Sequence, residues 1–209
     1  MRVGAGSLSI VPVRLAIAAS GEGTTFEHMA ANAAAGRIPI QLVMLLASRE
    51  NACVVDRARE LGVPVEVVAP TRFESAEGWD IAVERSIQEH RIELLLLAGF
   101  LRKLGPRTLR ALDGRILNTH PALLPKFGGK GMYGTAVHEA VLASGDQESG
   151  VTIHLVEEEY DTGPIVLQKR TPVEPGDTVQ SLKARVQCAE RDAVLEALLM
   201  FASGEIRAR

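Results

Sequence analysis

The sequence predicts an α/β fold: a single-domain, doubly wound, mostly parallel sheet with a mixed edge, of the Rossmann type. Two features of the sequence support this prediction. In the first half of the chain, apolar runs of strand length alternate with amphipathic segments of helical length. In the second half, two strand-like runs are joined by a single acidic loop, which indicates a partly antiparallel edge.

The predicted elements of the parallel part follow one another along the chain. The buried strands are Arg14–Ala19, Ile38–Ala47, Val63–Val68, Leu94–Ala98 and Ile116–Asn118. The amphipathic helices between the first four are about Thr24–Ala35, Ala52–Leu61 and Trp79–His90. The second helix ends at Leu61-Gly62-Val63-Pro64, where glycine allows a left-handed stop and proline prevents continuation. A strand is therefore expected directly after it.

The predicted antiparallel edge consists of Gly150–Val156 and Ile165–Lys169, joined by the acidic loop Glu157–Gly163. The last helix, Thr178–Phe201, carries an apolar stripe that should close over the sheet. With 46% hydrophobic residues, the 209-residue chain can bury one sizeable core. We expect a flexible N-terminal extension at residues 1–13, one domain at residues 14–202 and a C-terminal tail at residues 203–209.

The charge balance and the cysteines restrict the classes of function. A net charge of −3 and a pI near 6.0 provide no basic field for nucleic acid, so we expect small-molecule substrates. Cys53 and Cys188 lie far apart, which is not typical of a disulfide scaffold or a thiolate metal site. The first ten residues lack the apolar centre of a signal peptide, and no uncharged run reaches membrane-spanning length. We expect a cytoplasmic protein that binds no membrane.

The first candidate site is the turn Ser20-Gly21-Glu22-Gly23-Thr24-Thr25, between a predicted strand and a predicted helix. Glycines let the backbone approach a ligand, and the free N–H groups at a helix start favour a phosphate. The turn lacks the lysine of a Walker loop and the third glycine of GxGxxG. The alternative is a purely structural turn, and Glu22 would disfavour an anion if it pointed inward.

The second candidate site is Asn118-Thr119-His120-Pro121, at the carboxyl end of a predicted strand. This edge of an open α/β sheet binds ligands, and strand residues two positions apart face the same side. His120 can exchange a proton near neutral pH, and the amide of Asn118 can donate to the oxyanion of a tetrahedral intermediate. The pair suits acyl transfer, although a histidine before proline also has structural roles.

The third candidate site is Tyr160-Asp161-Thr162-Gly163-Pro164, in the loop between the two late strands. A carboxylate beside His120 would raise the pKa of the imidazole and orient its tautomer. The alternative is a solvated turn, because these are turn residues.

Other residues leave their roles open. His154 alternates with apolar residues along a strand, so it either faces the same crevice or packs with a hydrogen bond. The glycine-rich segment Lys126–Gly134 is either a long connector or, as we favour, a mobile flap. His28, His90 and His138 occur in helical patterns and are expected at the surface.

Four motifs together resemble the phosphoribosylglycinamide formyltransferases, within the folate-dependent formyltransferase family. In the family's order, they are Ser-Gly-x-Gly, Ala98-Gly99-Phe100-Leu101-Arg102, Asn118-x-His120-Pro121-Ala122-Leu123-Leu124-Pro125 and Asp161-x-Gly163-Pro164. The similarity covers about Arg14 to Phe201. It implies a formyltransferase-like fold that transfers a formyl group from 10-formyltetrahydrofolate to the amine of 5'-phosphoribosylglycinamide in purine biosynthesis, with no metal.

The resemblance also implies roles for individual residues. Asn118 would polarise the formyl carbonyl, His120 would transfer protons, and Asp161 would support the imidazole. The acceptor and its phosphate would be bound by Gly21, Gly23, Thr24, Thr25 and Glu190. The folate would be bound by Leu101, Arg102, Lys103, Leu104, Asn118 and Val156.

The chain departs from the family's pattern at two places. The family usually has asparagine at the positions of Glu22 and Thr25, and a basic folate-contacting residue near Phe73–Ala76 is not evident. The alternatives are a deformylase, a formyltransferase for another amine such as methionyl-tRNA, or a non-enzymatic nucleotide-binding module. The first two normally carry an extra domain, for which the segments outside Arg14–Phe201 are too short. Both a monomer and a homodimer are compatible with the sequence.

Overall fold

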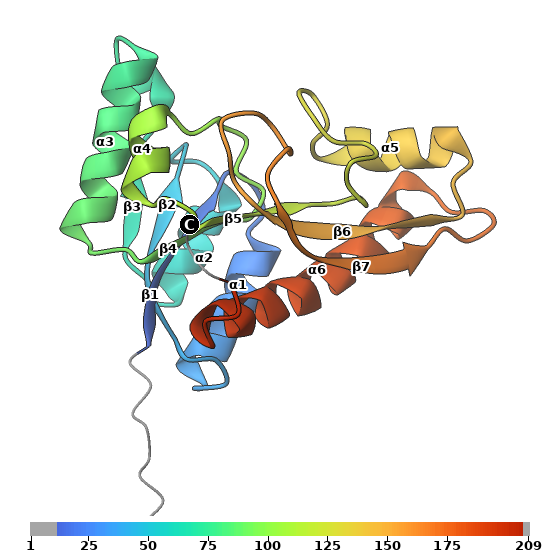
Figure 1. Ribbon diagram of the computed structural model, residues 1–209, viewed down its shortest axis with the longest axis horizontal. Coiled ribbons are helices and arrows are strands. Elements are labelled where there is room, and N and C mark those ends of the chain that lie inside the picture. Colours follow the sequence, from blue (N-terminus) through green and yellow to red (C-terminus); the bar gives the residue numbers. More distant parts are fainter. Residues whose placement is uncertain (1–11, 207–209) are drawn as a thin grey trace, which may run out of the picture.

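The computed structural model describes residues 12–206, which form a seven-stranded sheet with helices on both faces (Figure 1). The strands are β1 (Val13–Ala19), β2 (Ile40–Ala47), β3 (Val65–Val67), β4 (Leu94–Leu97), β5 (Ile116–His120), β6 (Glu148–Leu155) and β7 (Ile165–Pro172). The helices are α1 (Thr24–Ala34), α2 (Cys53–Glu60), α3 (Ala76–Glu89), α4 (Pro106–Ala111), α5 (Thr135–Ser144), α6 (Val179–Ala202) and the short 3-10 helix η1 (Pro70–Arg72).

The sheet has the predicted mixture of parallel and antiparallel strands. Its order is β3-β2-β1-β4-β5-β6-β7, with β1 to β5 parallel and with β6 antiparallel to both β5 and β7. The change of direction falls between β5 and β6, so the carboxyl end of β5 lies beside the middle of β6. This junction brings two late segments of the chain to the ligand-binding edge of the parallel sheet.

Alternating side chains of the central strands supply two cores. In β1, Leu15 and Ile17 face the core under α1, α2 and α6, whereas Ala16 and Ala18 face the core under α3 and α4. The alternation follows from the two-residue repeat of a strand, because both faces of a central strand are covered. Figure 1 shows the same division, with α3 and α4 on the opposite side of the sheet from α6.

Several predicted boundaries differ from those in the structure. Strand β2 begins at Ile40, β3 is shorter than predicted, and β6 and β7 extend to Glu148 and Pro172. Strand β5 continues through His120, so the histidine belongs to the strand itself. Gly62 has the left-handed φ of 67° expected of a helix stop. Residues 1–11 of the predicted extension and 207–209 of the predicted tail lie outside the described residues, whereas Val13 begins β1.

Helices α4 and α5 are absent from the predicted elements. Helix α4 has only six residues, and its start is held by a distant residue, the buried Asp80 of α3. Asp80 accepts hydrogen bonds from the backbone N–H groups of Arg107 and Thr108 at 2.8 and 3.1 Å. A helix start stabilised from another helix leaves no local sequence signal. None of the described helices is both long and apolar enough to span a membrane.

Candidate active site

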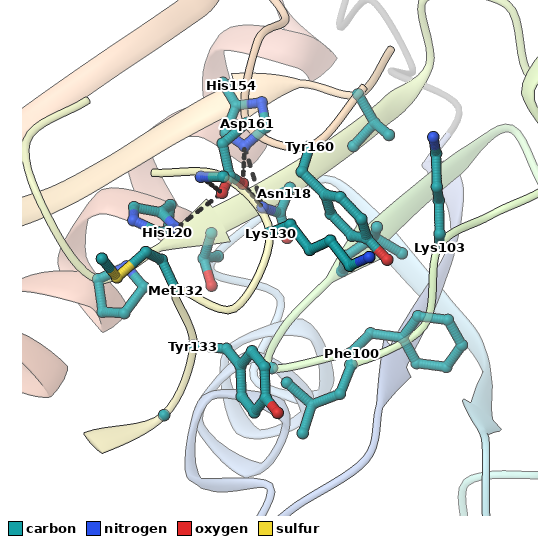
Figure 2. A pocket seen from close by; sticks show the side chains of 18 of the residues that line it. Phe100, Lys103, Asn118, His120, Lys130, Met132, Tyr133, His154, Tyr160 and Asp161 are labelled. Carbon is teal, nitrogen blue, oxygen red and sulfur yellow. Dashed lines mark hydrogen bonds and ion pairs between the residues drawn. The ribbon is translucent and has the colours of Figure 1, made fainter. Parts of the chain in front are cut away.

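A cavity of about 490 Å³ opens at the carboxyl ends of β4 and β5 (Figure 2). Its walls come from the segment after β4, from the end of β5, from the loop between β6 and β7, and from one face of α6. The glycine-rich segment between β5 and α5 supplies another wall through residues 129–134. The cavity therefore lies where the resemblance and the sheet topology both place a ligand.

The pairing of β5 with β6 determines how the polar side chains of the cavity meet. Asn118 and His154 are opposite each other in this antiparallel pair, and Asn118 Nδ2 lies 2.9 Å from His154 Nε2. The other ring nitrogen of His154 lies 2.8 Å from the carbonyl oxygen of Leu155. In the neutral ring, Nδ1 therefore donates to that carbonyl, and Nε2 accepts from the Asn118 amide. His154 thus faces the cavity and is also hydrogen-bonded, so both roles left open for it are present.

Asp161 lies between two imidazoles, as Figure 2 shows. Its Oδ2 is 3.5 Å from Nδ1 of His120, and its Oδ1 is 3.5 Å from Nε2 of His154. The backbone N–H of Gly129 donates to Oδ2 at 2.9 Å, and Asn118 Nδ2 lies 3.5 Å from Oδ1. The structure thus brings Asn118, His120 and Asp161 together in one cluster, although 43 residues separate the first from the last.

The loop that carries Asp161 is held against β6 by backbone contacts. Asp161 itself has a left-handed φ of 57°, which asparagine and aspartate tolerate better than most residues. Two residues later, a Cβ on Gly163 would lie 1.9 Å from the carbonyl oxygen of Leu155, so only glycine fits there. The N–H of Leu155 donates to the carbonyl of Pro164 at 2.9 Å. In the Asp-x-Gly-Pro motif, the packing of the loop therefore requires the glycine, and the aspartate is the residue that joins the polar cluster.

The buried Thr152 of β6 positions the loop that follows His120. Its hydroxyl donates to the carbonyl of Ala122 at 2.6 Å and accepts from the N–H of Leu124 at 3.0 Å. His120 is itself buried, and its Nε2 donates to the carbonyl of Phe127 at 2.8 Å. The Nδ1 lone pair of the neutral ring then faces Asp161. The glycine-rich segment is therefore attached to the cluster at Phe127 and Gly129, and its mobility remains a prediction.

The pKa values of the cluster differ from the simple expectation. Burial is the main effect on His120 and lowers its pKa, and the neighbouring Asp161 and the Phe127 carbonyl raise it only in part. The predicted direction of the Asp161 effect is therefore confirmed, but burial outweighs it. For Asp161, burial alone would raise the pKa, yet His154, the Gly129 N–H and His120 together lower it. The site thus combines an ionised carboxylate with an imidazole that is neutral near pH 7.

The predicted folate residues all line this cavity: Leu101, Arg102, Lys103, Leu104, Asn118 and Val156. The N–H of Leu101 donates to the hydroxyl of Ser20 at 3.2 Å, which ties this segment to the end of β1. Phe100 also lines the cavity and stacks on Trp79 of α3, with ring centroids 6.5 Å apart. Nζ of Lys103 lies 3.3 Å from Oε1 of Glu159 and 5.6 Å from the ring centroid of Tyr160.

The predicted phosphate turn has a clear structural role. Gly23 precedes α1 with a φ of 80°, and a Cβ there would lie 2.5 Å from Val54. Gly21, Gly23, Thr24 and Thr25 are not among the described residues that line the cavity. The turn is connected to the cavity through Glu190, which accepts from the hydroxyls of Thr119, at 2.8 Å, and Thr25. Burial raises the pKa of Glu190, and these two hydroxyls lower it in part.

Other residues of the site were missed or misplaced by sequence reasoning. His138, predicted at the surface, is only 2% exposed and lines the cavity, because the unpredicted helix α5 packs against α6. Lys183 and Gln187 line the cavity from α6, and their spacing of four and then three residues up to Glu190 could have indicated one helix face. Within residues 12–206, no group of three or more His, Cys, Asp or Glu side chains is placed to hold a metal ion.

Comparison with known proteins agrees with the sheet topology and the motifs. A family model described as formyl transferase matches residues 13–198. A chloroplastic phosphoribosylglycinamide formyltransferase of Arabidopsis thaliana is 38% identical over 184 residues, which are 88% of this chain and 63% of that protein. The trifunctional purine biosynthetic protein adenosine-3 of Drosophila pseudoobscura pseudoobscura is 35% identical over 93% of this chain, which spans only 14% of that protein.

Solved structures show the same similarity in three dimensions. The crystal structure of glycinamide ribonucleotide transformylase 1 from Symbiobacterium toebii has a TM-score of 0.87 and 34% identity, covering 92% of this chain and 89% of that one. The phosphoribosylglycinamide formyltransferase from Bacillus halodurans has a TM-score of 0.85 and 35% identity, covering 92% and 96%.

Proposed function

The chain belongs to the formyl transferase family, and on that premise we propose that it transfers a formyl group from 10-formyltetrahydrofolate to the amine of 5'-phosphoribosylglycinamide in purine biosynthesis. The observation that carries this proposal is the cluster of Asn118, His120 and Asp161 within a cavity that the predicted folate residues also line. The names of the relatives from Arabidopsis thaliana and Bacillus halodurans support this choice of acceptor.

The proposed reaction is direct transfer. The neutral amine of the acceptor attacks the formyl carbon, a tetrahedral intermediate forms, and the tetrahydrofolate nitrogen leaves. Holding both substrates in one cavity contributes through proximity, and a preorganised donor stabilises the oxyanion. No covalent enzyme intermediate is needed.

Each member of the cluster has a defined part in this reaction. The N–H of Asn118 that now points at Asp161, at a long 3.5 Å, is the one that can turn to the formyl oxygen. His120 carries the proton from the attacking amine towards the leaving nitrogen, and its neutral state near pH 7 suits it to accept that proton first. Asp161 then stabilises the imidazolium, as an ionised carboxylate does.

The folate is proposed to lie along the wall formed by Leu101, Arg102, Lys103, Leu104 and Val156, with Asn118 at its inner end. The apolar side chains of this wall can pack against an aromatic ring system. Arg102, Lys103 and Lys130 line the cavity away from α6, and they can receive the carboxylates of the folate's glutamate. Arg72, next to Phe73–Ala76, is ion-paired with Glu50 and is not among the described residues that line the cavity.

The acceptor is proposed to occupy the opposite end of the cavity, between α6 and the start of α1. Glu190 faces the cavity and can accept hydrogen bonds from the acceptor's hydroxyl or amino groups. The phosphate would then reach the N–H groups at Gly21, Gly23, Thr24 and Thr25, where the helix dipole favours an anion.

The remaining predictions are retained as part of this proposal. We propose that residues 14–202 form the catalytic domain, that the protein acts in the cytoplasm and that it is a monomer or a homodimer. The free thiols of Cys53 and Cys188 support a reducing compartment.

One assay tests the proposed function. The purified protein is incubated with 10-formyltetrahydrofolate and 5'-phosphoribosylglycinamide, and both formylated acceptor and tetrahydrofolate are quantified. Equal amounts of the two products are expected, with no turnover when the acceptor is omitted. Release of formate without acceptor would identify a deformylase, and formylation of a different amine would reassign the acceptor.

A further inference from the structure

One face of α6 forms the wall at the acceptor end of the cavity. Lys183, Gln187 and Glu190 recur at helical spacing, and all three line the cavity. The other lysines and arginines that line it, Arg102, Lys103 and Lys130, come from the segment after β4 and from the glycine-rich segment. Lys183 is therefore the cation that α6 contributes, on the wall nearest the start of α1.

Lys183 is paired with the unusual residue of the phosphate turn. Its Nζ lies 3.7 Å from Oε1 of Glu22, a long ion pair in which the lysine side chain is 31% exposed and the glutamate 64%. Exposed ion pairs at this distance are weak, because both groups stay hydrated. Glu22 can thus leave Lys183 for solvent at little cost, and Lys183 can exchange one anion for another.

His138 provides an independent indication of a ligand at the same end. It lines the cavity from α5, it is 2% exposed, and its Nδ1 has no hydrogen-bond partner among residues 12–206. Buried polar groups almost always have a partner, and this ring nitrogen, which is closed to solvent beside the cavity, has none that the described residues supply. The tautomer with hydrogen on Nδ1 would donate to an anion.

The charges around His138 favour an anion as that ligand. Burial, then the charge of Lys183, then that of His120, lower the pKa of His138 to about 4. No carboxylate contributes to this shift, so the groups that act on the ring are cationic or can become so. The positive charge of Lys183 therefore acts on the same part of the cavity wall as His138.

We infer that Lys183 determines specificity for the phosphorylated acceptor: its ammonium exchanges Glu22 for the acceptor's phosphate, and Nδ1 of His138 donates a further hydrogen bond. This inference rests on the proposed function. The phosphate then lies between the N–H groups at the start of α1 and the cationic face of α6. Glu22 and Lys183 are a compensating pair, which explains how this chain carries a carboxylate in an anion-binding turn.

Steady-state kinetics of matched variants test the role of Lys183. Lys183→Gln should raise KM for 5'-phosphoribosylglycinamide by roughly 10- to 100-fold, the usual effect of losing a charged hydrogen bond. KM for the same acceptor without its phosphate, and KM for 10-formyltetrahydrofolate, should stay unchanged. The control is Lys169→Gln, which removes a lysine paired with Glu196 at 2.9 Å and outside the cavity wall. Its kinetics should match those of the wild type.

Two further comparisons separate binding from simple repulsion or misfolding. His138→Leu should raise the same KM about tenfold, and His138→Asn, which keeps a donor near Nδ1, should restore most of the loss. With Lys183 present, Glu22→Gln should lower KM for the phosphorylated acceptor, because the carboxylate no longer competes with the phosphate for the lysine. In the Lys183→Gln background the same change should lower this KM less, because there is no lysine to compete for.

The outcomes distinguish this inference from the proposed function. If wild-type protein formylates the acceptor and Lys183→Gln changes its KM by less than about twofold, the inference is wrong while the function stands. A larger decrease in this KM for Glu22→Gln in the absence of Lys183 would also overturn the inference, because Glu22 would then act only by repelling the phosphate. If wild-type protein does not formylate this acceptor at all, the proposed function itself fails.

Discussion

The two ends of the cavity are built in different ways. At the proposed catalytic end, His120 and Asp161 already have partners: His120 donates to the Phe127 carbonyl, and Asp161 accepts from the Gly129 N–H and faces two imidazoles. At the acceptor end, His138 has an unpaired Nδ1, and Lys183 has only a long contact with Glu22 among the residues that the structure describes.

The difference agrees with the parts that we propose for the two ends in the reaction. Groups that stabilise a transition state act best when they are held in place before the substrate arrives, since no reorganisation is then needed. Groups that select a substrate can remain incompletely paired, because the correct substrate supplies the missing partner. The proposed catalytic end is therefore the preorganised part of the site, and the proposed acceptor end is the part that we expect a ligand to complete.

The largest expected effect tests the catalytic end directly. His120→Ala should lower turnover by roughly 10²–10⁴, the usual contribution of a positioned acid or base. Turnover with both substrates at saturation is the measurement, and His28→Ala on α1 is the control. A loss smaller than about tenfold would mean that another group transfers the proton.

A second change alters the charge of the catalytic end and keeps its shape. Asp161→Asn tolerates the left-handed backbone at this position but removes the carboxylate that raises the pKa of His120. The pKa of His120 should fall further, so the histidine limb of the pH–rate profile should move to lower pH. Turnover should also fall, by roughly 10- to 100-fold, because the imidazole loses its partner. An unmoved profile with unchanged turnover would make Asp161 a turn residue only.

The third prediction concerns the unpaired histidine of the acceptor end. The pKa of His138 is lowered from 6.5 to about 4 on folding, so the folded state binds fewer protons between these values. Above pH 6.5 this histidine does not reduce the free energy of unfolding. As the pH falls from 6.5 to 4, the free energy of unfolding should decrease by about 3 kcal/mol in total. Urea unfolding at several pH values measures this slope. His138→Leu should flatten it, and an unchanged slope in that variant would contradict the prediction.

The smallest expected effect separates the two possible reasons for glycine in the turn. Gly23→Ala should lower the free energy of unfolding by about 1–3 kcal/mol, because φ is positive and the new Cβ would clash with Val54. Gly36→Ala is the matched control, since its φ is also positive but its Cβ would meet nothing within 4 Å. Adding Val54→Ala should recover part of the lost free energy of unfolding in the Gly23→Ala variant, and none of it in the Gly36→Ala variant. Equal losses at both glycines would contradict the packing reason.

Local patterns in the sequence were sufficient where one element carries its own signal. The alternation of apolar runs and amphipathic segments predicted the strands β1 to β4 and the helices between them, and Gly62-Val63-Pro64 predicted the end of α2. The motifs around Asn118, His120 and Asp161 identified the side chains that meet in the cavity. Such signals survive in a single sequence because they depend on neighbours along the chain.

Contacts between distant segments decided the rest. Helix α4 depends on Asp80, 27 residues from the first N–H that it caps, and His138 is buried because α5 packs on α6. The net direction of the His120 pKa also depends on burial, which no local pattern reports. The sequence by itself determined the fold class and the residues of the cluster. The tertiary structure decided which of them are desolvated and that Lys183 faces Glu22, because burial and charge pairing arise only when distant segments pack together.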